Sequence, residues 1–314
     1  MSDQTLKKLR IGTRGSPLAM VQANMVKDQL LKAYPDLEIE IIPIKSAADW
    51  KKQDGENPLS EQQGGKGQFA KEIEKAHLDG LIDCGVHSLK DMACFLPDEL
   101  EISHVMTRAD ARDAFISAKY KTIDDLPAGG AVGTCSPRRR AFILSKRPDL
   151  NVVPFRGNVK TRLDKVKDNQ VDATYLAMAG ITRLGIEDDA IKPVDVNDML
   201  PACGQGVVCI ETKKDDPAVQ SLMDTIHCHD TMLCASAERE ILKELDGSCH
   251  TPIGAYATLL EGVIYLRAQV SSLDGQIIYH EEIKQECPDL GAAISIGHAL
   301  AVTLKSKLPE GFLA

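Results

Sequence analysis

The sequence lacks any segment that would export the chain or hold it in a membrane. Its first residues, MSDQTLKKLRIGTRG, contain no apolar signal region. No later run approaches the roughly 18 consecutive apolar residues that a membrane-spanning helix needs. We therefore expect a cytoplasmic protein that does not bind membranes.

The sequence also lacks a disulfide framework and an excess of positive charge. Its nine cysteines are odd in number and irregularly spaced, which in a chain of 314 residues indicates reduced thiols. The formal net charge of −9 argues against general binding of nucleic acid or anionic membranes. Local groups of arginine are the more informative because they run against this average.

Strand and helix patterns alternate over the first two-thirds of the chain. LRIGT, LEIEIIPI and LIDCGVHS are typical of strands, and residues 16–34 and 69–80 are typical of helices. Ser16 is the expected cap of the first helix and Gly80 the expected end of the second. Leu18, Val21 and Met25 mark the expected apolar stripe of the first helix. This order predicts a mostly parallel sheet that binds ligands at the carboxyl ends of its strands.

The opening pattern occurs a second time. IGTRGSPLA (11–19) and VGTCSPRRRA (132–141) both read as a strand, Gly-Thr, a short loop, Ser-Pro and a helix. The repeat predicts two similar, doubly wound α/β domains that face a cleft.

The pattern changes from about residue 229. A helix over 231–247, with Leu233, Ala237 and Ile241 on one face, precedes three strands joined by EG and DG hairpin signals, and a helix over 290–307 follows. This predicts a smaller α+β domain. The expected division is 1–106 with 207–226 for the first domain, 107–206 for the second and 227–314 for the third.

Arginines gather at the predicted strand ends and helix starts. Arg14 precedes the first Ser-Pro helix start, and Arg138, Arg139 and Arg140 lie in the first turn of the second. Because a helix N-terminus favours negative charge, three arginines there indicate an external anion that offsets their repulsion. Arg156, Arg162 and Arg183 add forked donors suited to carboxylates or phosphates.

Two further segments carry polar groups of interest. GVHSLKDM presents His87, Ser88, Lys90 and Asp91 after an apolar strand, where a carboxylate could serve as general acid, although an isolated Asp–Lys pair is more often a turn cap. GGKGQF (64–69) lacks the spacing of a nucleotide loop. HCHD (227–230) with Cys234 lacks the paired cysteines of a structural zinc site, and we predict no metal.

DGSCHTPIGA (246–255) places Cys249 in a loop between the first helix and first strand of the third domain. Its neighbour His250 cannot serve as its catalytic partner, because adjacent side chains do not face each other on a helix or share one face of a strand. The residues around Cys249 therefore do not indicate a hydrolase nucleophile.

Together these motifs resemble one family, hydroxymethylbilane synthase, also called porphobilinogen deaminase. The resemblance covers essentially the whole chain and is highly specific in combination. It is carried, in order, by IGTRGSPLAMVQA, GGKGQFAKEIEKA, DCGVHSLKDM, RADARDAFIS, VGTCSPRRRA, FRGNVKTRLDK, PACGQGVVCIE and DGSCHTPIGA.

The resemblance implies a transferase of tetrapyrrole and heme biosynthesis. Such enzymes join four porphobilinogen molecules head to tail with loss of ammonia, then release the linear product by adding water. A dipyrromethane cofactor, attached through a thioether to the cysteine matching Cys249, primes the reaction. The family also implies a monomer whose partner is a small molecule.

The resemblance further assigns roles residue by residue. Asp91 matches the catalytic aspartate, which would stabilise positive charge on the pyrroles and assist proton transfer. The positions that match cofactor- and substrate-binding residues bear groups for the acetate and propionate of each pyrrole. They are Cys249, Lys90, Ser88, Thr134, Ser136, Arg138 and Arg139 for the cofactor, and Arg14, Ser16, Arg156, Arg162 and Arg183 for the substrate.

Some positions depart from the family pattern. Ser248 replaces a usual glycine before the anchoring cysteine, Ala93 and Cys94 replace Pro-Thr, Pro137 replaces leucine and Lys160 replaces asparagine. None of them removes a residue to which chemistry is assigned, so they bear on loop geometry and rate.

A different class of protein fits part of the pattern. Two α/β lobes around an anion-lined cleft also describe periplasmic binding proteins and ligand-sensing domains. The absence of an export signal or a helix-turn-helix segment counts against them, as does the third domain with Cys249. A catalytically inactive family member is a milder alternative, although Asp91, Cys249 and the arginines are present.

Overall fold

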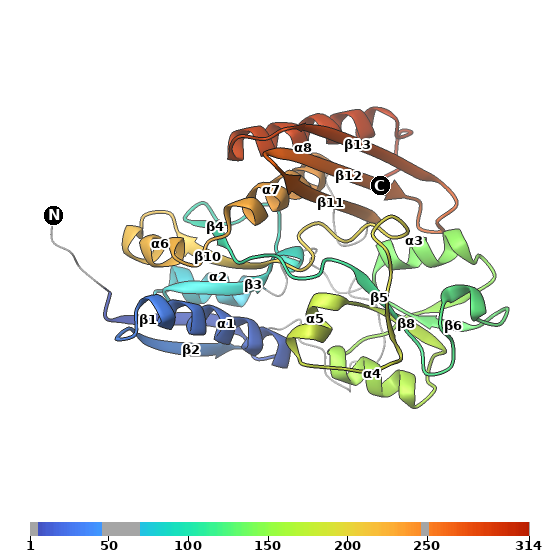
Figure 1. Ribbon diagram of the computed structural model, residues 1–314, viewed down its shortest axis with the longest axis horizontal. Helices are drawn as coiled ribbons and strands as arrows, with labels where there is room; N and C mark the ends of the chain where they lie inside the picture. Colours follow the sequence, from blue (N-terminus) through green and yellow to red (C-terminus); the bar gives the residue numbers. More distant parts are fainter. Residues whose placement is uncertain (1–5, 46–69, 246–250, 314) are drawn as a thin grey trace. The chain divides into compact units, whose positions relative to one another are not determined.

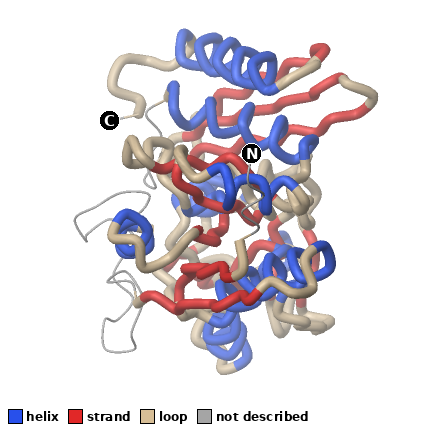
Figure 2. Tube along the Cα trace, turned by 90° about the vertical axis from the view of Figure 1, so that its left-hand side faces the viewer, coloured by secondary structure: helices blue, strands red, loops and turns tan. Residues whose placement is uncertain are grey.

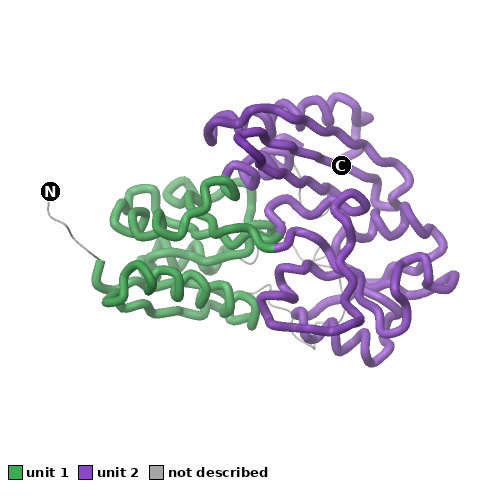
Figure 3. The backbone as a smooth tube through the Cα atoms, viewed as in Figure 1, with its two compact units in different colours: residues 1–49, 66–109, 206–232 green, residues 50–65, 110–205, 233–314 purple. Residues whose placement is uncertain are grey.

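The computed structural model describes residues 6–45, 70–245 and 251–313. These form two compact units (Figure 3). The first holds the described parts of residues 1–49, 66–109 and 206–232, and the second those of 50–65, 110–205 and 233–314. The second unit thus contains both the second and nearly all of the third predicted domain, and the three-domain division stays a prediction. Among the described residues, no helix combines the length and apolar character needed to cross a membrane.

The first unit is built on a five-stranded sheet with the order β2-β1-β3-β10-β4 (Figure 1). β1 pairs in parallel with β2 and β3, while β10 runs antiparallel between β3 and β4. The strands are β1 (Lys8–Arg14), β2 (Glu38–Ile44), β3 (Cys84–Ser88), β4 (Leu100–Val105) and β10 (Val208–Lys213). The fourth strand in space is therefore supplied by a segment that returns about a hundred residues later.

Helices cover both faces of this sheet. The crossovers from β1 to β2 and from β2 to β3 run in opposite directions across it, so right-handed connections put their helices on opposite faces. The helices of this unit are α1 (Pro17–Ala33), α2 (Lys71–Leu78) and α6 (Pro217–Asp224). Apolar side chains of α1 pack with Leu9 and Ile11, whereas those of α2 pack with Ile82 and the far face of β2.

The start of α1 agrees with the sequence prediction, but its buried face does not. Ser16 caps the helix by accepting the backbone N–H of Ala19 at 3.4 Å. The buried face contains Ala19, Gln22, Ala23, Val26 and Leu30, one position beyond the expected stripe of Leu18, Val21 and Met25, which are only half-buried. This shift brings a polar residue, Gln22, onto the covered side.

The second unit contains a sheet of the same design, with the order β7-β6-β8-β5-β9. β6 pairs in parallel with β7 and β8, and β5 runs antiparallel between β8 and β9. Its elements are β5 (Asp113–Ile116), β6 (Ala131–Gly133), α3 (Pro137–Lys146), β7 (Asn151–Val153), α4 (Val159–Lys167), β8 (Ala173–Ala177), α5 (Met178–Arg183) and β9 (Ile191–Pro193). The predicted pair of similar α/β folds is confirmed.

The rest of the second unit is the predicted α+β region. An antiparallel sheet β11-β12-β13 carries α8 along β12 and β13 (Figures 1 and 2). The elements are α7 (His229–Glu244), β11 (Ile253–Leu260), β12 (Val263–Ser271), β13 (Ile278–Glu286) and α8 (Leu290–Ser306). Glu261 and Gly262 both have positive φ, 51° and 76°, as the EG hairpin signal predicts. The fully buried Glu238 of α7 accepts the backbone N–H groups of Gly204 and Ala257.

Candidate active site

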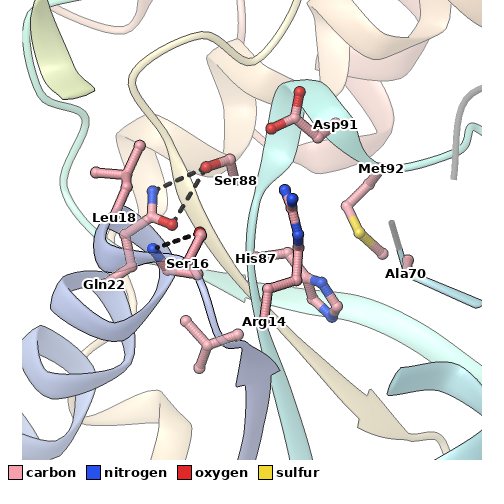
Figure 4. Close-up of a pocket in the computed structure, with 11 residues that line it drawn as sticks. Arg14, Ser16, Leu18, Gln22, Ala70, His87, Ser88, Asp91 and Met92 are labelled. Atoms are coloured by element: carbon pink, nitrogen blue, oxygen red, sulfur yellow. Dashed lines mark hydrogen bonds between the residues drawn. The ribbon is translucent and has the colours of Figure 1, made fainter. Parts of the chain in front are cut away.

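A pocket opens in the first unit where β1 and β3 end and α1 begins (Figure 4). This is the carboxyl edge of the parallel strands, where α/β sheets commonly bind ligands. Side chains from β1, the start of α1, β3, the turn after β3 and the residue before α2 line it. They are Arg14, Ser16, Leu18, Ala19, Gln22, Ala70, Val86, His87, Ser88, Asp91 and Met92.

One side of the pocket is suited to anions. Arg14 is the last residue of β1, and Ser16 caps α1, a 17-residue helix with no acidic residue in its first turn. The free N–H groups and the dipole of a helix N-terminus attract negative charge, and the guanidinium adds a full positive charge. The pocket can therefore receive a carboxylate.

The pocket also presents a carboxylate of its own. Asp91 ends a 3₁₀ turn, Leu89–Asp91, that follows β3 directly. Two backbone hydrogen bonds hold this turn: Leu89 N–H donates to Val207 O at 3.0 Å, and Met92 N–H donates to Leu89 O at 3.1 Å. Ser88 exchanges hydrogen bonds with the amide of Gln22 at 2.8 and 3.2 Å. The adjacent Lys90 is half-buried and does not line the pocket.

His87 forms a buried part of the pocket wall. Burial is the main cause that lowers its pKa, which keeps the imidazole neutral near pH 7. The charges of Glu211 and Asp91 oppose this shift, whereas His77 and Arg14 reinforce it.

In the second unit, two predicted binding residues meet an internal acid. Asp113, the first residue of β5, is fully buried, and its Oδ2 accepts a hydrogen bond from Arg138 Nη2 at 2.7 Å. Its Oδ1 accepts hydrogen bonds from Arg139 Nη2 at 2.7 Å and from Arg139 Nε at 3.0 Å. Arg138 Nη1 donates to the backbone carbonyl of Leu200, and Arg139 Nη1 donates to that of Tyr175, both at 2.7 Å.

This arrangement corrects the inference drawn from the arginine run. An external anion is not the only group that can offset the repulsion among these arginines, because Asp113 already offsets part of it. Arg140 donates to the backbone carbonyl of Val152 at 3.1 Å. Two buried guanidinium groups nevertheless face one carboxylate, which leaves one positive charge in excess. Arg138 Nε is buried and has no hydrogen-bond partner among the described residues. Such a donor can accommodate an added acceptor.

The remaining predicted residues of this unit lie around the same strand ends. Thr134 is buried, and its hydroxyl accepts the N–H of Ser136 at 3.1 Å, while Ser136 caps α3 by accepting the N–H of Arg139 at 3.4 Å. Arg156 is buried in the turn before α4, Arg162 is half-buried on α4, and burial lowers the pKa of Arg183 at the end of α5. Each unit thus gathers its own part of the predicted set.

The predicted anchor, Cys249, lies outside the described residues. The other eight cysteines are free thiols. Within the described parts of the chain, no group of three or more His, Cys, Asp or Glu side chains is arranged to hold a metal ion.

Sequence reasoning gave no role to several residues that the structure brings to these sites. Asp113 stands in RADARDAFIS and Glu211 in PACGQGVVCIE, both of which served only as family motifs. Gln22 is a polar residue at helical spacing from the buried Ala19 and Val26, and this spacing was the available signal. His77 carried no signal, since its acid partner is 134 residues away in sequence.

Comparison with protein families accounts for most of the chain. The family description "Porphobilinogen deaminase, dipyromethane cofactor binding domain" matches residues 9–221. "Porphobilinogen deaminase, C-terminal domain" matches residues 232–306. The match to the C-terminal domain follows the match to the cofactor-binding domain along the chain.

Individual relatives agree with this match. A porphobilinogen deaminase of Nitrobacter winogradskyi is 44% identical over 99% of this chain and 97% of its own length. One of Lawsonia intracellularis is 41% identical over 98% of both chains.

Among solved structures, the BenM effector-binding domain with benzoate has a TM-score of 0.41 and 16% identity, covering 70% of this chain and 91% of that one. An arginine-specific periplasmic binding protein of Salmonella typhimurium has a TM-score of 0.40 and 14% identity, covering 70% and 92%.

Proposed function

The chain belongs to the porphobilinogen deaminase family, and we propose that it joins four porphobilinogen molecules head to tail with loss of ammonia and releases hydroxymethylbilane by hydrolysis. The observation that carries this proposal is the pocket of the first unit. It combines an anion-attracting helix start and Arg14 with the carboxyl group of Asp91. A substrate that carries carboxylates and reacts through a cationic pyrrole needs both.

The second unit fits a dipyrromethane cofactor. Its excess buried positive charge and the Nε of Arg138, which has no partner within the part of the chain that the structure describes, suit an acidic group. We assign cofactor binding to Thr134, Ser136, Arg138 and Arg139 of this unit and to Ser88 and Lys90 of the first unit, and covalent attachment to Cys249. When bound, the cofactor supplies the pyrrole carbon to which the first substrate is joined.

We assign substrate binding to residues that can neutralise the acetate and propionate groups of porphobilinogen. Arg14 and Ser16 would do so at the start of α1, where guanidinium, hydroxyl and backbone N–H groups lie close together. The other three are Arg156, Arg162 and Arg183. A growing chain adds two carboxylates with each unit, so several cations spread over different elements are required.

Asp91 is the proposed catalytic residue. An ionised carboxylate in the pocket stabilises positive charge that develops on a pyrrole as ammonia leaves, and it can accept or return a proton. The backbone bonds of the 3₁₀ turn hold Asp91 before substrate arrives, which reduces the reorganisation needed during reaction.

We further propose that the protein is a cytoplasmic monomer.

The intact mass of the protein under denaturing conditions tests this function. We expect wild-type protein to carry the added mass of a dipyrromethane and Cys249→Ser protein to lack it, because only a covalent thioether survives denaturation. Cys94→Ser is the matched control and should load normally. A wild type that stays unmodified after incubation with porphobilinogen would exclude the proposal and favour a non-catalytic anion-binding protein.

A further inference from the structure

Three buried ionisable side chains meet behind the Asp91 pocket. They are His77 of α2, His87 of β3 and Glu211 of β10, and all three are buried. His77 Nδ1 lies 3.0 Å from Glu211 Oε1, and His87 Nε2 lies 3.7 Å from Glu211 Oε2. One carboxyl group therefore stands between two imidazoles, and only His87 lines the pocket.

The hydrogen bonds of His77 fix how many protons His77 and Glu211 hold together. His77 Nε2 lies 3.0 Å from the carbonyl oxygen of Asp83, which can only accept, so Nε2 carries a hydrogen. At 3.0 Å, Nδ1 and Glu211 Oε1 must share another proton, because two acceptors do not approach so closely. The pair is therefore either imidazolium with carboxylate or imidazole with carboxylic acid. Both forms have zero net charge.

The space for the His87 ring is created by a glycine. Gly85 precedes His87 by two residues on the same face of β3, and it pairs with Glu211 across the sheet. A Cβ atom at Gly85 would lie 2.6 Å from His87 Nε2 and 3.4 Å from Glu211 Oε1. The ring thus lies over Gly85 with its Nε2 edge toward the carboxyl group.

His87 and Glu211 lie close together but slightly beyond hydrogen-bond distance. Neither His87 Nε2 nor Glu211 Oε2 has a hydrogen-bond partner among the described residues, and both atoms are buried. A movement of about half an ångström would bring them within hydrogen-bond distance. Each is thus the other's available partner, since an unsatisfied buried polar atom is costly.

The charges around His87 show why its position matters to the pocket. It faces Arg14 of β1, Asp91 of the 3₁₀ turn, His77 of α2 and Glu211 of β10, while Glu74 of α2 faces Glu211. When the His87 ring is neutral and its Nε2 edge lies near Glu211, it does not repel the Arg14 guanidinium. His87 and Arg14 both line the pocket (Figure 4).

We propose that Glu211 is a positioning residue that holds the His87 ring as the inner wall of the Asp91 pocket and acts on turnover through His87. This inference rests on the proposed function of that pocket. Glu211 does not touch the substrate, and its effect reaches the reacting groups only through the ring and its neighbour Arg14.

A double-mutant cycle on kcat/KM tests this coupling. Rates are divided by the fraction of protein that carries cofactor, measured by mass. We expect Glu211→Leu to lower kcat/KM about tenfold in the wild type but less than about twofold in His87→Ala protein, because the ring it positions is then absent. An equal loss in both backgrounds would mean that Glu211 acts independently of His87, and the proposal would be wrong.

The matched control is Glu238→Leu, which removes another fully buried carboxyl group that accepts the backbone N–H groups of Gly204 and Ala257 and does not line the pocket. Its effect should be the same in both backgrounds. Coupling of Glu238 to His87 as strong as that of Glu211 would also overturn the proposal, since any loss of a buried acid would then produce it.

A second measurement needs neither turnover nor Glu211→Leu, whose folding the loss of a buried acceptor could impair. In ¹⁵N-histidine-labelled protein, we expect the His87 ring to be neutral with its hydrogen on Nε2, and its nitrogen shifts to change in Glu211→Gln. A ring protonated on Nδ1 that ignores this substitution would refute the contact. Wild-type protein that makes no hydroxymethylbilane would instead refute the proposed function, whatever the spectrum.

Discussion

The two five-stranded sheets arrange equivalent strands side by side in the same way and in the same register, although β10 comes last along the chain in its sheet and β5 comes first in its own. They place their charges differently. In the first sheet, β10 begins with Val208 opposite Ser88, the last residue of β3. In the second, β5 begins with Asp113 opposite Ala177, the last residue of β8. The equivalent positions therefore hold an apolar residue in one sheet and a buried acid in the other.

The helices that follow the first strands differ in the same way. After the Ser-Pro start, α1 continues with Leu18 and Ala19, and α3 continues with Arg138 and Arg139. In the first unit the acid, Asp91, stands in the turn after β3 and lines a pocket. One backbone design thus supports a pocket lined by an acidic side chain in one unit and a buried, cation-rich cluster in the other, and single side chains make the difference.

Replacing the acid of the first sheet should have the largest effect. Asp91→Asn keeps the shape of the side chain but removes its charge and proton transfer, so we expect turnover to fall by about 10²- to 10⁴-fold. Cofactor loading, measured by mass, should remain. Asp98→Asn, an exposed acid outside the pocket, is the control. Near-normal turnover of Asp91→Asn would remove the proposed distinction between the two sheets.

Making the second sheet resemble the first should destabilise it strongly. Asp113→Val leaves two buried guanidinium groups without their carboxylate, and we expect a loss of about 3–5 kcal/mol in the free energy of unfolding, measured by urea denaturation. Asp110→Val removes the partner of Arg112 in an exposed pair and should cost less than about 1 kcal/mol. Equal losses would show that burial of the Asp113 pair does not matter.

A matched pair of glycines tests how rigidly each sheet is packed. Gly12 and Gly133 occupy equivalent places in the two Gly-Thr segments. A Cβ at Gly133 would lie 2.5 Å from Cγ of the Phe155 ring, whereas one at Gly12 would meet the terminal methyl of Ile82, which can rotate away. We expect Gly133→Ala to cost about 1–3 kcal/mol and Gly12→Ala less, by urea denaturation. The reverse order would contradict this account.

The smallest expected effect concerns a carboxyl group behind the first sheet. Burial and the charge of Glu211 raise the pKa of Glu74 to about 7. A raised pKa means that the folded protein binds more protons than the unfolded chain between about pH 4.5 and 7, so stability falls as the pH rises through this range.

Glu74→Gln should therefore stabilise the protein at pH 8, by no more than about 1 kcal/mol because the group is partly exposed, and the gain should vanish below about pH 4.5. Thermal unfolding at both pH values measures it. A gain that is independent of pH would not come from the charge of Glu74.

Much of the fold could be predicted because local signals repeat. The two Gly-Thr/Ser-Pro segments predict two similar sheets, and the EG hairpin and the helix over 290–307 lie close to where the pattern puts them. The buried face of α1 was missed by one position, since the small Ala19 and Ala23 give a weaker hydrophobic signal than Leu18 and Val21.

The sequence by itself determined the repeated βαβ units, the helix caps and the family to which the chain belongs, because each rests on neighbouring residues or on ordered motifs. Only the tertiary structure decided which charges meet. Asp113 reaches Arg138 and Arg139 from 25 and 26 residues away, and Glu211 reaches His77 from 134 residues away. Such pairs depend on strand order and register, and a crossing strand such as β10 or β5 has no local signal that states where it will lie.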